Sequence, residues 1–541
     1  MYCRRFASIA LSAAACTATL SAQTEDFKYV ASDAGPLDGF GHAADVDGNF
    51  VVIGARDALI GGVDRIGAAY VFDRTTGAEL YKIVPVDGAD YDKFGYSIAV
   101  QNGIALIGAP HHDVATPDDQ AGAVYIYDLN TGLEIGRLLP PTMDFNGHFG
   151  IGVDIDGNLA AVGGFTRKTL GVDKTGEAFV FDWPTGVQLH SLVATDATKG
   201  DRMGWTVAID GGFVLVGAHF DDDAGKDAGS AYIFDATTGA QVHKLLPLSL
   251  GNNDSFGWKL DMENGIAVVG AHMQNGMGKA NEGAIYVFDV ASGNELARHI
   301  PPDGVAEDKF GYSIDLDGSR LAVSSVGSDS AGSNAGAVYV LDVITGAVEF
   351  KLTASDAETG DQFGAFVRLE TNTLVVGALL EDDGGNAAGA SYQFDLNSCT
   401  TTHYCTVAGG SVNNISNLEA SGCDLSSAIT LDLSSGPPSQ FTYLLIGAGS
   451  SVVTNPAGAV GDLCVVGGFL SRYRLDLGAI SAAGTFTTDI SSSASGGPGF
   501  GIPSSGGASI QPGETWNFQY WHRNPSGALS GFSEAVSVTF K

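Results

Sequence analysis

The chain has 541 residues and a formal net charge of −35, with 75 Gly but only 27 Lys and Arg. Such an excess of negative charge argues against proteins that bind the phosphates of nucleic acids or dock on anionic lipid. Hydrophobic residues make up 44% of the chain, which allows a sizeable core and excludes an intrinsically disordered protein. We therefore expect no nucleic-acid partner and no insertion into a membrane.

The first 22 residues have the features of a secretory signal peptide. Arg4 and Arg5 form a short basic region, residues 6–20 are apolar and small, and Ala22 closes a small-residue cleavage site. The apolar stretch is too short to span a bilayer. We expect residues 1–22 to be removed, and the mature protein to be secreted and extracellular or bound at the cell surface, in an oxidising compartment.

From residue 40 onwards, one motif recurs with a nearly fixed period. Each copy starts with Phe-Gly or Met-Gly and reaches a Gly-Ala-like pair at the end of its second apolar run. The copies begin at Phe40, Phe94, Phe149, Met203, Phe256, Phe310 and Phe363, at steps of 53 to 55 residues. A period of this length indicates an array of supersecondary units.

Each unit contains four apolar or alternating segments joined by turns and loops. In the second unit these segments are residues 96–100, 104–107, 123–128 and 133–139. The turn at Asn102-Gly103 is typical of a tight hairpin. Four antiparallel strands repeated around an axis form a propeller blade. The sequence thus predicts an all-β fold, with a seven-bladed β-propeller over residues 23–397.

The two ends of the array indicate how the ring closes. The seventh unit has its third segment at residues 390–396 and then runs into Cys-rich sequence, so its fourth strand is missing. The stretch 27–34 closely resembles residues 350–357, which form the fourth strand of the sixth unit. We expect the strand at residues 27–31 to complete the seventh blade and to cover two otherwise exposed edges.

The repeated motif resembles the FG-GAP repeat family, whose propellers include those of integrin α-subunits. The nearest copy to the family pattern has Phe94-Gly95-Tyr96-Ser97, Gly108-Ala109-Pro110 and Gly122-Ala123-Val124-Tyr125. The resemblance covers roughly residues 27–397, and implies a seven-bladed propeller with a role in extracellular adhesion or ligand binding.

One feature departs from the integrin-type pattern. Integrin-type repeats often carry an acidic calcium loop between the two elements of the motif, whereas this chain has short turns there, such as Asp47-Gly48-Asn49. Such a turn has no room for six or more oxygen ligands. The resemblance is therefore to the short-turn bacterial form of the family, and it implies no calcium in these turns.

Propeller topology places the long connections of every blade on one face. They join strand four to strand one of the next blade, and strand two to strand three. Their acidic residues are at positions 87, 90, 92, 113, 118, 119, 196, 201, 221–223, 227, 303, 307, 308, 356, 358, 361 and 381–383. Long loops on a rigid scaffold commonly carry binding sites. We expect this acidic face to bind an extracellular protein or glycan ligand, with cations as a further partner.

The densest acidic loop is the candidate metal site. Hard cations such as Ca²⁺ need several carboxylate and carbonyl oxygens. Asp221, Asp222, Asp223 and Asp227 supply carboxylates within seven residues, and we take them as candidate Ca²⁺ ligands. Consecutive Asp side chains do not all point the same way, and Lys226 competes for them. The alternative is therefore a solvated acidic turn.

Histidines follow the Gly-Ala pair in three repeats, at His111-His112, His219 and His272. Two interpretations stay open for them. They are ligands of a transition metal, or they are loop residues that pack in the same way because the blades repeat.

No catalytic constellation stands out in the chain. Nucleophile elbows, His-Glu-x-x-His and phosphate-binding Gly-Lys-Ser/Thr loops are absent from the sequence, and carboxylates are too many for one acid–base pair to be singled out. We predict a secreted binding or adhesion protein that is not an enzyme. The alternatives are an exported propeller enzyme acting on a polysaccharide or other polymer, and a structural component of the cell surface.

Composition changes after residue 397, where charge falls and Ser, Gly and Thr rise. Short apolar segments between Gly, Ser and Pro turns predict a β-sandwich over residues 398–541. Trp516, Tyr520 and Trp521 are read either as sandwich core or as exposed aromatics that bind carbohydrate.

The cysteines that would remain after signal removal all lie in this second region, at positions 399, 405, 423 and 464. Four cysteines allow three pairings. We favour disulfides between Cys405 and Cys423 and between Cys399 and Cys464.

Overall fold

The computed structural model describes residues 25–396 apart from 117–118, 143, 170 and 277, and beyond residue 400 it describes the backbone of ten strands. One compact unit covers residues 23–396, and residues 397–541 belong to a second. No helix occurs among the described residues, so none of them forms a helix that could cross a membrane.

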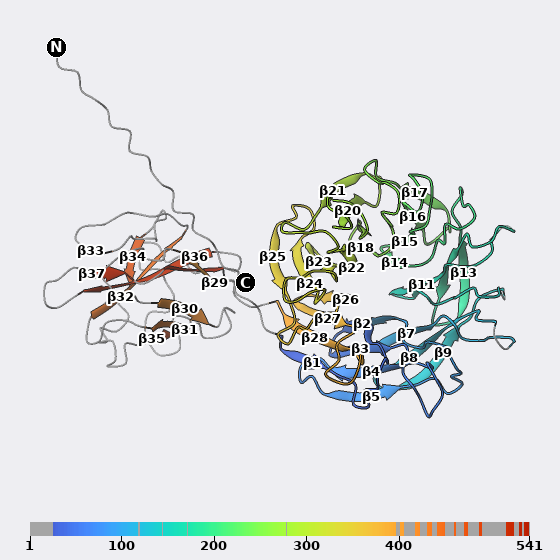
Figure 1. Ribbon diagram of the computed structural model, residues 1–541, viewed down its shortest axis with the longest axis horizontal. Helices are drawn as coiled ribbons and strands as arrows, with labels where there is room; N and C mark the ends of the chain where they lie inside the picture. Colours follow the sequence, from blue (N-terminus) through green and yellow to red (C-terminus); the bar gives the residue numbers. More distant parts are fainter. Residues whose placement is uncertain are drawn as a thin grey trace, which may run out of the picture. The chain divides into compact units, whose positions relative to one another are not determined.

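The first unit is a ring of seven four-stranded antiparallel sheets (Figure 1). This confirms the predicted all-β, seven-bladed propeller. In blades 1 to 3 the strands are β2 (Phe40–Asp47), β3 (Phe50–Ala55), β4 (Ala68–Asp73), β5 (Glu79–Ile83), β6 (Ser97–Gln101), β7 (Ile104–Ala109), β8 (Ala123–Asp128), β9 (Leu133–Leu138), β10 (Val153–Asp156), β11 (Leu159–Gly164), β12 (Glu177–Asp182) and β13 (Val187–Leu192).

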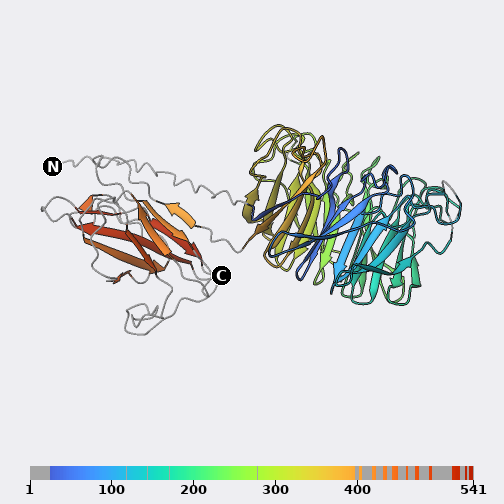
Figure 2. The same cartoon turned by 90° about the horizontal axis from the view of Figure 1, so that it is seen from below.

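Blades 4 to 6 repeat this order, with the first strand of each sheet innermost and the fourth outermost. Figure 2 shows the same blades from the side. Their strands are β14 (Val207–Asp210), β15 (Phe213–Ala218), β16 (Ser230–Asp235), β17 (Gln241–Leu245), β18 (Leu260–Glu263), β19 (Ile266–Ala271), β20 (Ala284–Asp289), β21 (Glu295–His299), β22 (Phe310–Asp317), β23 (Arg320–Ser325), β24 (Ala337–Asp342) and β25 (Val348–Leu352).

The seventh blade is assembled from both ends of the unit. It holds β26 (Phe363–Glu370), β27 (Thr373–Ala378), β28 (Ala390–Asp395) and, as its outermost strand, β1 (Phe27–Tyr29). Phe27 lies opposite Gln393 in the antiparallel register, and Tyr29 lies opposite Ser391. The early strand thus occupies the place that the similarity of residues 27–34 to 350–357 indicates, although it has three residues rather than five.

The repeated glycines are explained by contacts between neighbouring blades. Gly95 has a φ of 86°, a left-handed conformation that favours glycine. A Cβ added to Gly54 of the preceding blade would lie 2.1 Å from the Gly95 carbonyl oxygen. Phe94 beside it is fully buried, with its ring 5.3 Å from that of Tyr125 in an edge-to-face contact. The two halves of the motif are therefore one interface between blades.

The second unit contains two sheets. One holds β29 (Thr401–Tyr404), β38 (Ala535–Thr539), β36 (Thr515–Arg523), β32 (Phe441–Ala448) and β34 (Leu470–Tyr473), extended by β33 (Ala459–Val460) and β37 (Ser530–Phe532). The other holds β30 (Asn417–Ser421), β31 (Thr430–Ser434) and β35 (Phe486–Asp489). The sandwich arrangement stays a prediction, and the cysteines at 399, 405, 423 and 464 lie outside the described residues.

Candidate ligand-binding site

The first strands of the seven blades line a central channel that encloses a cavity of about 170 Å³. Each first strand begins at the long-loop face and ends at the tight turn between strands one and two. We call the two openings the loop end and the turn end of the channel.

The loop end is lined by the residue that lies two positions after the first residue of each motif. Five of these seven residues are aromatic rings. In blade order they are His42, Tyr96, Ile151, Trp205, Trp258, Tyr312 and Ala365. The loop end is therefore lined by rings from five different blades.

The rings of blades 3 to 6 form a continuous contact, which we call the aromatic arc. It consists of Phe165, Trp205, His219, Trp258, His272 and Tyr312. The centroids of Trp205 and Trp258 are 5.2 Å apart, and those of Trp258 and Tyr312 are 5.8 Å apart. His219 contacts both Trp rings, at 5.2 and 5.1 Å, and His272 contacts Trp258 at 4.8 Å.

Three ring nitrogens of the arc are buried without a hydrogen-bond partner. They are Nδ1 of His219, Nδ1 of His272 and Nε1 of Trp258. Burial lowers the pKa of His219 and of His272 to about 3, so both imidazoles are neutral at physiological pH. Buried polar atoms in native proteins are nearly always paired, so three unpaired nitrogens in one cluster call for an explanation. A ligand with hydroxyl groups would provide one.

The middle of the channel is polar and already paired. Arg368 donates to Asp45 at 2.6 Å and to Asp315 at 2.5 Å. Asp154 and Asp261 also line the cavity. Each accepts a backbone N–H from the first strand of the next blade. Burial raises the pKa of Asp154 to about 7. These carboxylates tie the blades together.

The turn end is closed by a complete circle of hydrogen bonds. The last polar side chain of each first strand accepts the backbone N–H of the turn in the following blade. The seven bonds run from Gly103 to Asp47, Gly157 to Gln101, Gly211 to Asp156, Asn264 to Asp210, Gly318 to Glu263, Thr371 to Asp317 and Gly48 to Glu370.

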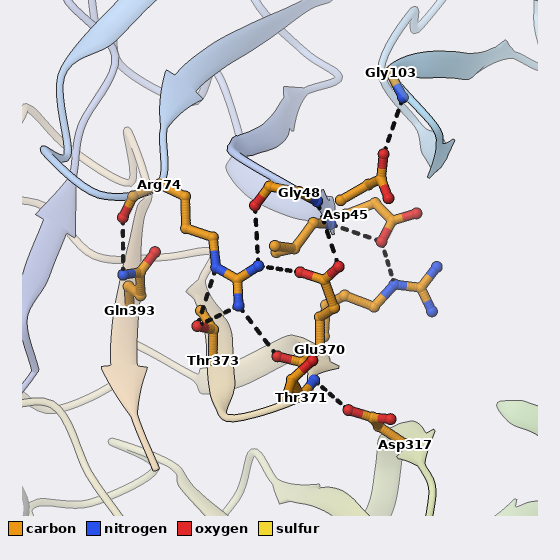
Figure 3. A network of polar contacts seen from close by, with 12 residues as sticks. Asp45, Gly48, Arg74, Gly103, Asp317, Glu370, Thr371, Thr373 and Gln393 are labelled. Atoms are coloured by element: carbon orange, nitrogen blue, oxygen red, sulfur yellow. Dashed lines mark hydrogen bonds and ion pairs between the residues drawn. The ribbon is translucent and has the colours of Figure 1, made fainter. Parts of the chain in front are cut away.

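The circle is reinforced where blade 7 meets blade 1 (Figure 3). Arg74 pairs with the Glu370 carboxylate, and it also donates to Thr373 Oγ1 at 2.6 Å and to the Gly48 carbonyl at 3.0 Å. Gln393 donates to the Arg74 carbonyl oxygen at 3.2 Å. The polar groups at the turn end therefore hold the ring of blades closed.

The candidate calcium ligands do not converge as one set. Asp221 and Asp223 both accept from Lys244 Nζ, at 3.0 and 2.5 Å, while Asp222 accepts the backbone N–H of Asp227. Asp221 is buried and also accepts from the hydroxyls of two neighbouring side chains, those of Ser230 and Tyr232. An ammonium group thus occupies the position between Asp221 and Asp223.

Six of the seven blades contain the same cross-strand pair, a Tyr on strand three opposite a Lys or Arg on strand four. The pairs are Tyr70–Lys82, Tyr125–Arg137, Tyr232–Lys244, Tyr286–Arg298, Tyr339–Lys351 and Tyr392–Lys28. Most of these cations bind acids of the long loops. Lys28 Nζ lies 2.6, 2.9 and 2.7 Å from Asp356, Glu381 and Asp383.

Those last three carboxylates are the one group of metal-ligating side chains within 4.8 Å of each other in the part of the chain that the structure describes. Lys28 lies among them. Several carboxylates of the acidic face are thereby paired with the protein's own cations, which sequence reasoning missed. A Lys or Arg at the same position of each fourth strand was the available signal.

Blade 3 departs from this pattern. Phe179 and Ser191 stand where other blades have Tyr and a cation. The cation comes instead from the loop, because Arg167 lies over the Phe179 ring at 5.2 Å and pairs with Glu177 at 3.1 Å.

The remaining histidine candidates are separated. His112 pairs with Asp92 at 2.9 Å, which raises the pKa of His112 against the opposing effect of burial. His111 contacts His148 with the ring centroids 4.7 Å apart and the rings tilted, whereas His219 and His272 belong to the aromatic arc. The signal that would have identified the arc is Trp205 and Trp258 at equivalent positions of consecutive repeats.

The repeats match a known family of proteins. A family model described as FG-GAP repeat matches residues 24–72, 78–127, 187–234, 240–288, 294–341 and 348–394, together more than half of the chain. The unmatched interval, residues 128–186, contains the first three strands of blade 3. No curated protein matches the chain.

Several solved propellers are similar in shape at low sequence identity. "Structure of U3-55K" is 11% identical with a TM-score of 0.46, over 68% of this chain and 99% of that one. "Crystal structure of RRP9 WD40 repeats" is 10% identical with a TM-score of 0.47, over 70% and 100%. A chain of "Crystal Structure of Mitotic Checkpoint Complex" is 11% identical with a TM-score of 0.45, over 73% and 98%.

Proposed function

The chain belongs to the FG-GAP repeat family, and from that premise we propose that it is a secreted binding or adhesion protein that captures an extracellular ligand with the loop end of its propeller channel. The observation that carries this proposal is the aromatic arc, with three buried ring nitrogens that lack partners. Aromatic faces beside a few convergent polar atoms are typical of ligand sites.

The contact surface that we propose is narrower than the whole acidic face. Several carboxylates of the acidic loops are engaged by cations of the fourth strands, as at Lys28 and Lys244. The rings of the aromatic arc are not occupied in this way, since they contact mainly one another. The proposal therefore centres binding on the mouth of the channel and gives the acidic loops a supporting role.

Two substitutions of the same residue type test the location of the site. Trp258→Ala removes the ring at the centre of the arc, and Trp183→Ala removes a ring whose Nε1 donates to Gly157 at the opposite face. Wild type and both variants would be applied to a glycan and protein array, with and without calcium. A central aromatic contact is expected to be worth about 2 kcal/mol or more.

We expect Trp258→Ala to lose most of the binding that the wild type shows, and Trp183→Ala to retain it. Equal binding by all three proteins would contradict the proposed site. Turnover of a glycan would contradict the proposal that the protein binds without catalysis. Thermal melting of each variant separates loss of the site from loss of the fold.

Secretion and disulfide formation are part of the same proposal. Removal of residues 1–22 would give a mature chain that starts at Gln23, close to the first described residue of the propeller. Intact-mass measurement of the exported protein tests both points. The expected mass is that of residues 23–541 less four hydrogens, for two disulfides among Cys399, Cys405, Cys423 and Cys464.

A further inference from the structure

The loop end of the channel carries positive charge in a strongly negative protein. Within the described ranges, the side chains of Arg202, Lys259 and Lys309 form no ion pair or hydrogen bond with a carboxylate, although the net charge of the chain is −35. Acidic partners are abundant elsewhere, and Lys28 alone binds three of them. The three cations at the mouth are therefore not paired with carboxylates, although carboxylates are abundant in the chain.

Two of these cations occupy equivalent positions in different blades. Arg202 and Lys309 each precede the first residue of a motif, with φ values of 55° and 58°. The charge of Arg202 lowers the pKa of His219, and the charge of Lys309 lowers that of His272. Both cations thus lie near the buried histidines of the aromatic arc. Arg202 also lies over the Phe220 ring at 4.5 Å.

The third cation lies inside the channel. Lys259 follows Trp258 in the chain, and both line the cavity. Burial, then the charge of Arg56 and then that of Lys259 lower the pKa of His42, which lines the same cavity. Burial, with the charge of Arg368, lowers the pKa of Lys259 to about 8, so the amine stays mostly protonated at neutral pH. A partly desolvated ammonium without a counterion gains from any anion placed beside it.

The shape and chemistry of the mouth favour a sugar as the carrier of that anion. The cavity of about 170 Å³ is smaller than the roughly 300 Å³ at which pockets for drug-sized molecules begin. Trp205, Trp258 and Tyr312 line the cavity with aromatic rings, and the unpartnered nitrogens of His219 and His272 suit hydroxyl groups. A densely charged polymer would instead be repelled by the acidic loops around the mouth.

Resting on the function proposed above, we infer that the loop end binds an anionic sugar unit of an extracellular glycan, with the sugar ring on the aromatic arc and the acidic group on Lys259. Arg202 and Lys309 flank the mouth and attract the same charge. A uronate carboxylate and a sulfate ester offer equivalent chemistry to these cations.

Three soluble probes separate the contribution of charge from that of stacking. They are trigalacturonate, its methyl ester, which keeps the rings but lacks the charge, and a sulfated trisaccharide. Binding of each probe to the full-length secreted protein would be measured by calorimetry. We expect trigalacturonate or the sulfated trisaccharide to bind at least tenfold more tightly than the ester, and the tighter of the two identifies the acidic group.

Lys259→Met keeps the length of the side chain and removes its charge. We expect this variant to lose at least tenfold in affinity for the acidic probe and to bind the ester like the wild type. Lys199→Gln is the matched control, because Lys199 is exposed on a loop and forms no side-chain contact. An unchanged melting temperature shows that the fold is intact.

The results distinguish this inference from the proposal on which it rests. If ester and acid bind equally, or if Lys259→Met changes nothing, the inference is overturned while the proposed binding site stands on the Trp258→Ala result. If none of the three probes binds at millimolar concentration, the inference is overturned as well. Equal array binding by Trp258→Ala and wild type overturns both.

Discussion

The two ends of the channel are built from the same seven strands, yet they differ in how strictly they repeat. At the turn end every blade contributes one acceptor to a closed circle of hydrogen bonds. At the loop end the equivalent positions hold five rings, an Ile and an Ala. The hydrogen-bonding role is thus repeated in every blade at the turn end, whereas the side chains differ from blade to blade at the loop end.

The largest effect on stability is expected at the turn end. Arg74→Met removes five side-chain hydrogen bonds at the seam between blades 7 and 1 and leaves Glu370 without its cation. We expect a loss of about 2–3 kcal/mol in the free energy of unfolding, measured in urea. Arg202→Gln at the loop end should stay within about 0.5 kcal/mol of wild type. Equal losses of stability in the two variants would contradict the predicted difference between the two ends of the channel.

A smaller effect is expected on the outer part of the loop face. Lys244→Met leaves Asp196, Asp221 and Asp223 without their shared ammonium group. We expect a loss of about 2 kcal/mol or less, because Asp223 is half exposed. The three carboxylates would then be free for a hard cation.

This variant also sharpens the calcium prediction. We expect millimolar Ca²⁺ to raise the melting temperature of Lys244→Met more than that of wild type, since in wild type the ion must displace Lys244. Lys226→Met is the control, because Lys226 is exposed and lies 3.5 Å from Asp227. A larger Ca²⁺ response in wild type than in Lys244→Met would contradict the ammonium as the competing group.

A change in pH dependence is expected in the middle of the channel. The pKa of Asp154 is raised to about 7 in the folded protein, whereas an unfolded Asp titrates near 3.9, so the folded state binds more protons between these values. This carboxyl therefore stabilises the fold at low pH, and that contribution is lost as the pH rises through 7.

Asp154→Asn removes this dependence and keeps an oxygen that can accept the Ile209 N–H. Relative to wild type, the variant should gain stability as the pH rises from about 5 to 8, as read from urea midpoints. A difference that is constant over this range would show that Asp154 does not titrate there. Asp210→Asn, at the exposed turn end, serves as the control.

The blade count and the closing strand were predictable because each rests on a repeated or copied local pattern. The contact between Gly54 and Gly95 recurs in nearly every blade, so its residues recur too. The neutralisation of Asp221 was not predictable in the same way. Its partner Lys244 is 23 residues away, whereas Lys226, the cation considered from the sequence, is adjacent in the loop.

The aromatic arc escaped sequence reasoning for a related reason. Trp205 and Trp258 each lie two residues after the first residue of their motif. At this position the alternation of apolar and polar residues does not indicate whether a ring faces the core or the channel. For His219 and His272 the sequence leaves open metal binding or packing of repeated loop residues, and in the structure their Nδ1 atoms are buried beside the Trp rings. The irregular start of the first strands decides which way these rings point.

The strand shared between the two ends of the propeller has a consequence for its biogenesis. Tyr29 donates its hydroxyl to Gln393 at 2.7 Å, across 364 residues. Entropy of loop closure grows only with the logarithm of the separation, so the contact is affordable, but high contact order makes it slow. Strand β1 is synthesised long before β28 and must wait for it, and until then β28 is an unprotected edge. Export in an unfolded state would let both segments reach the same compartment before they meet.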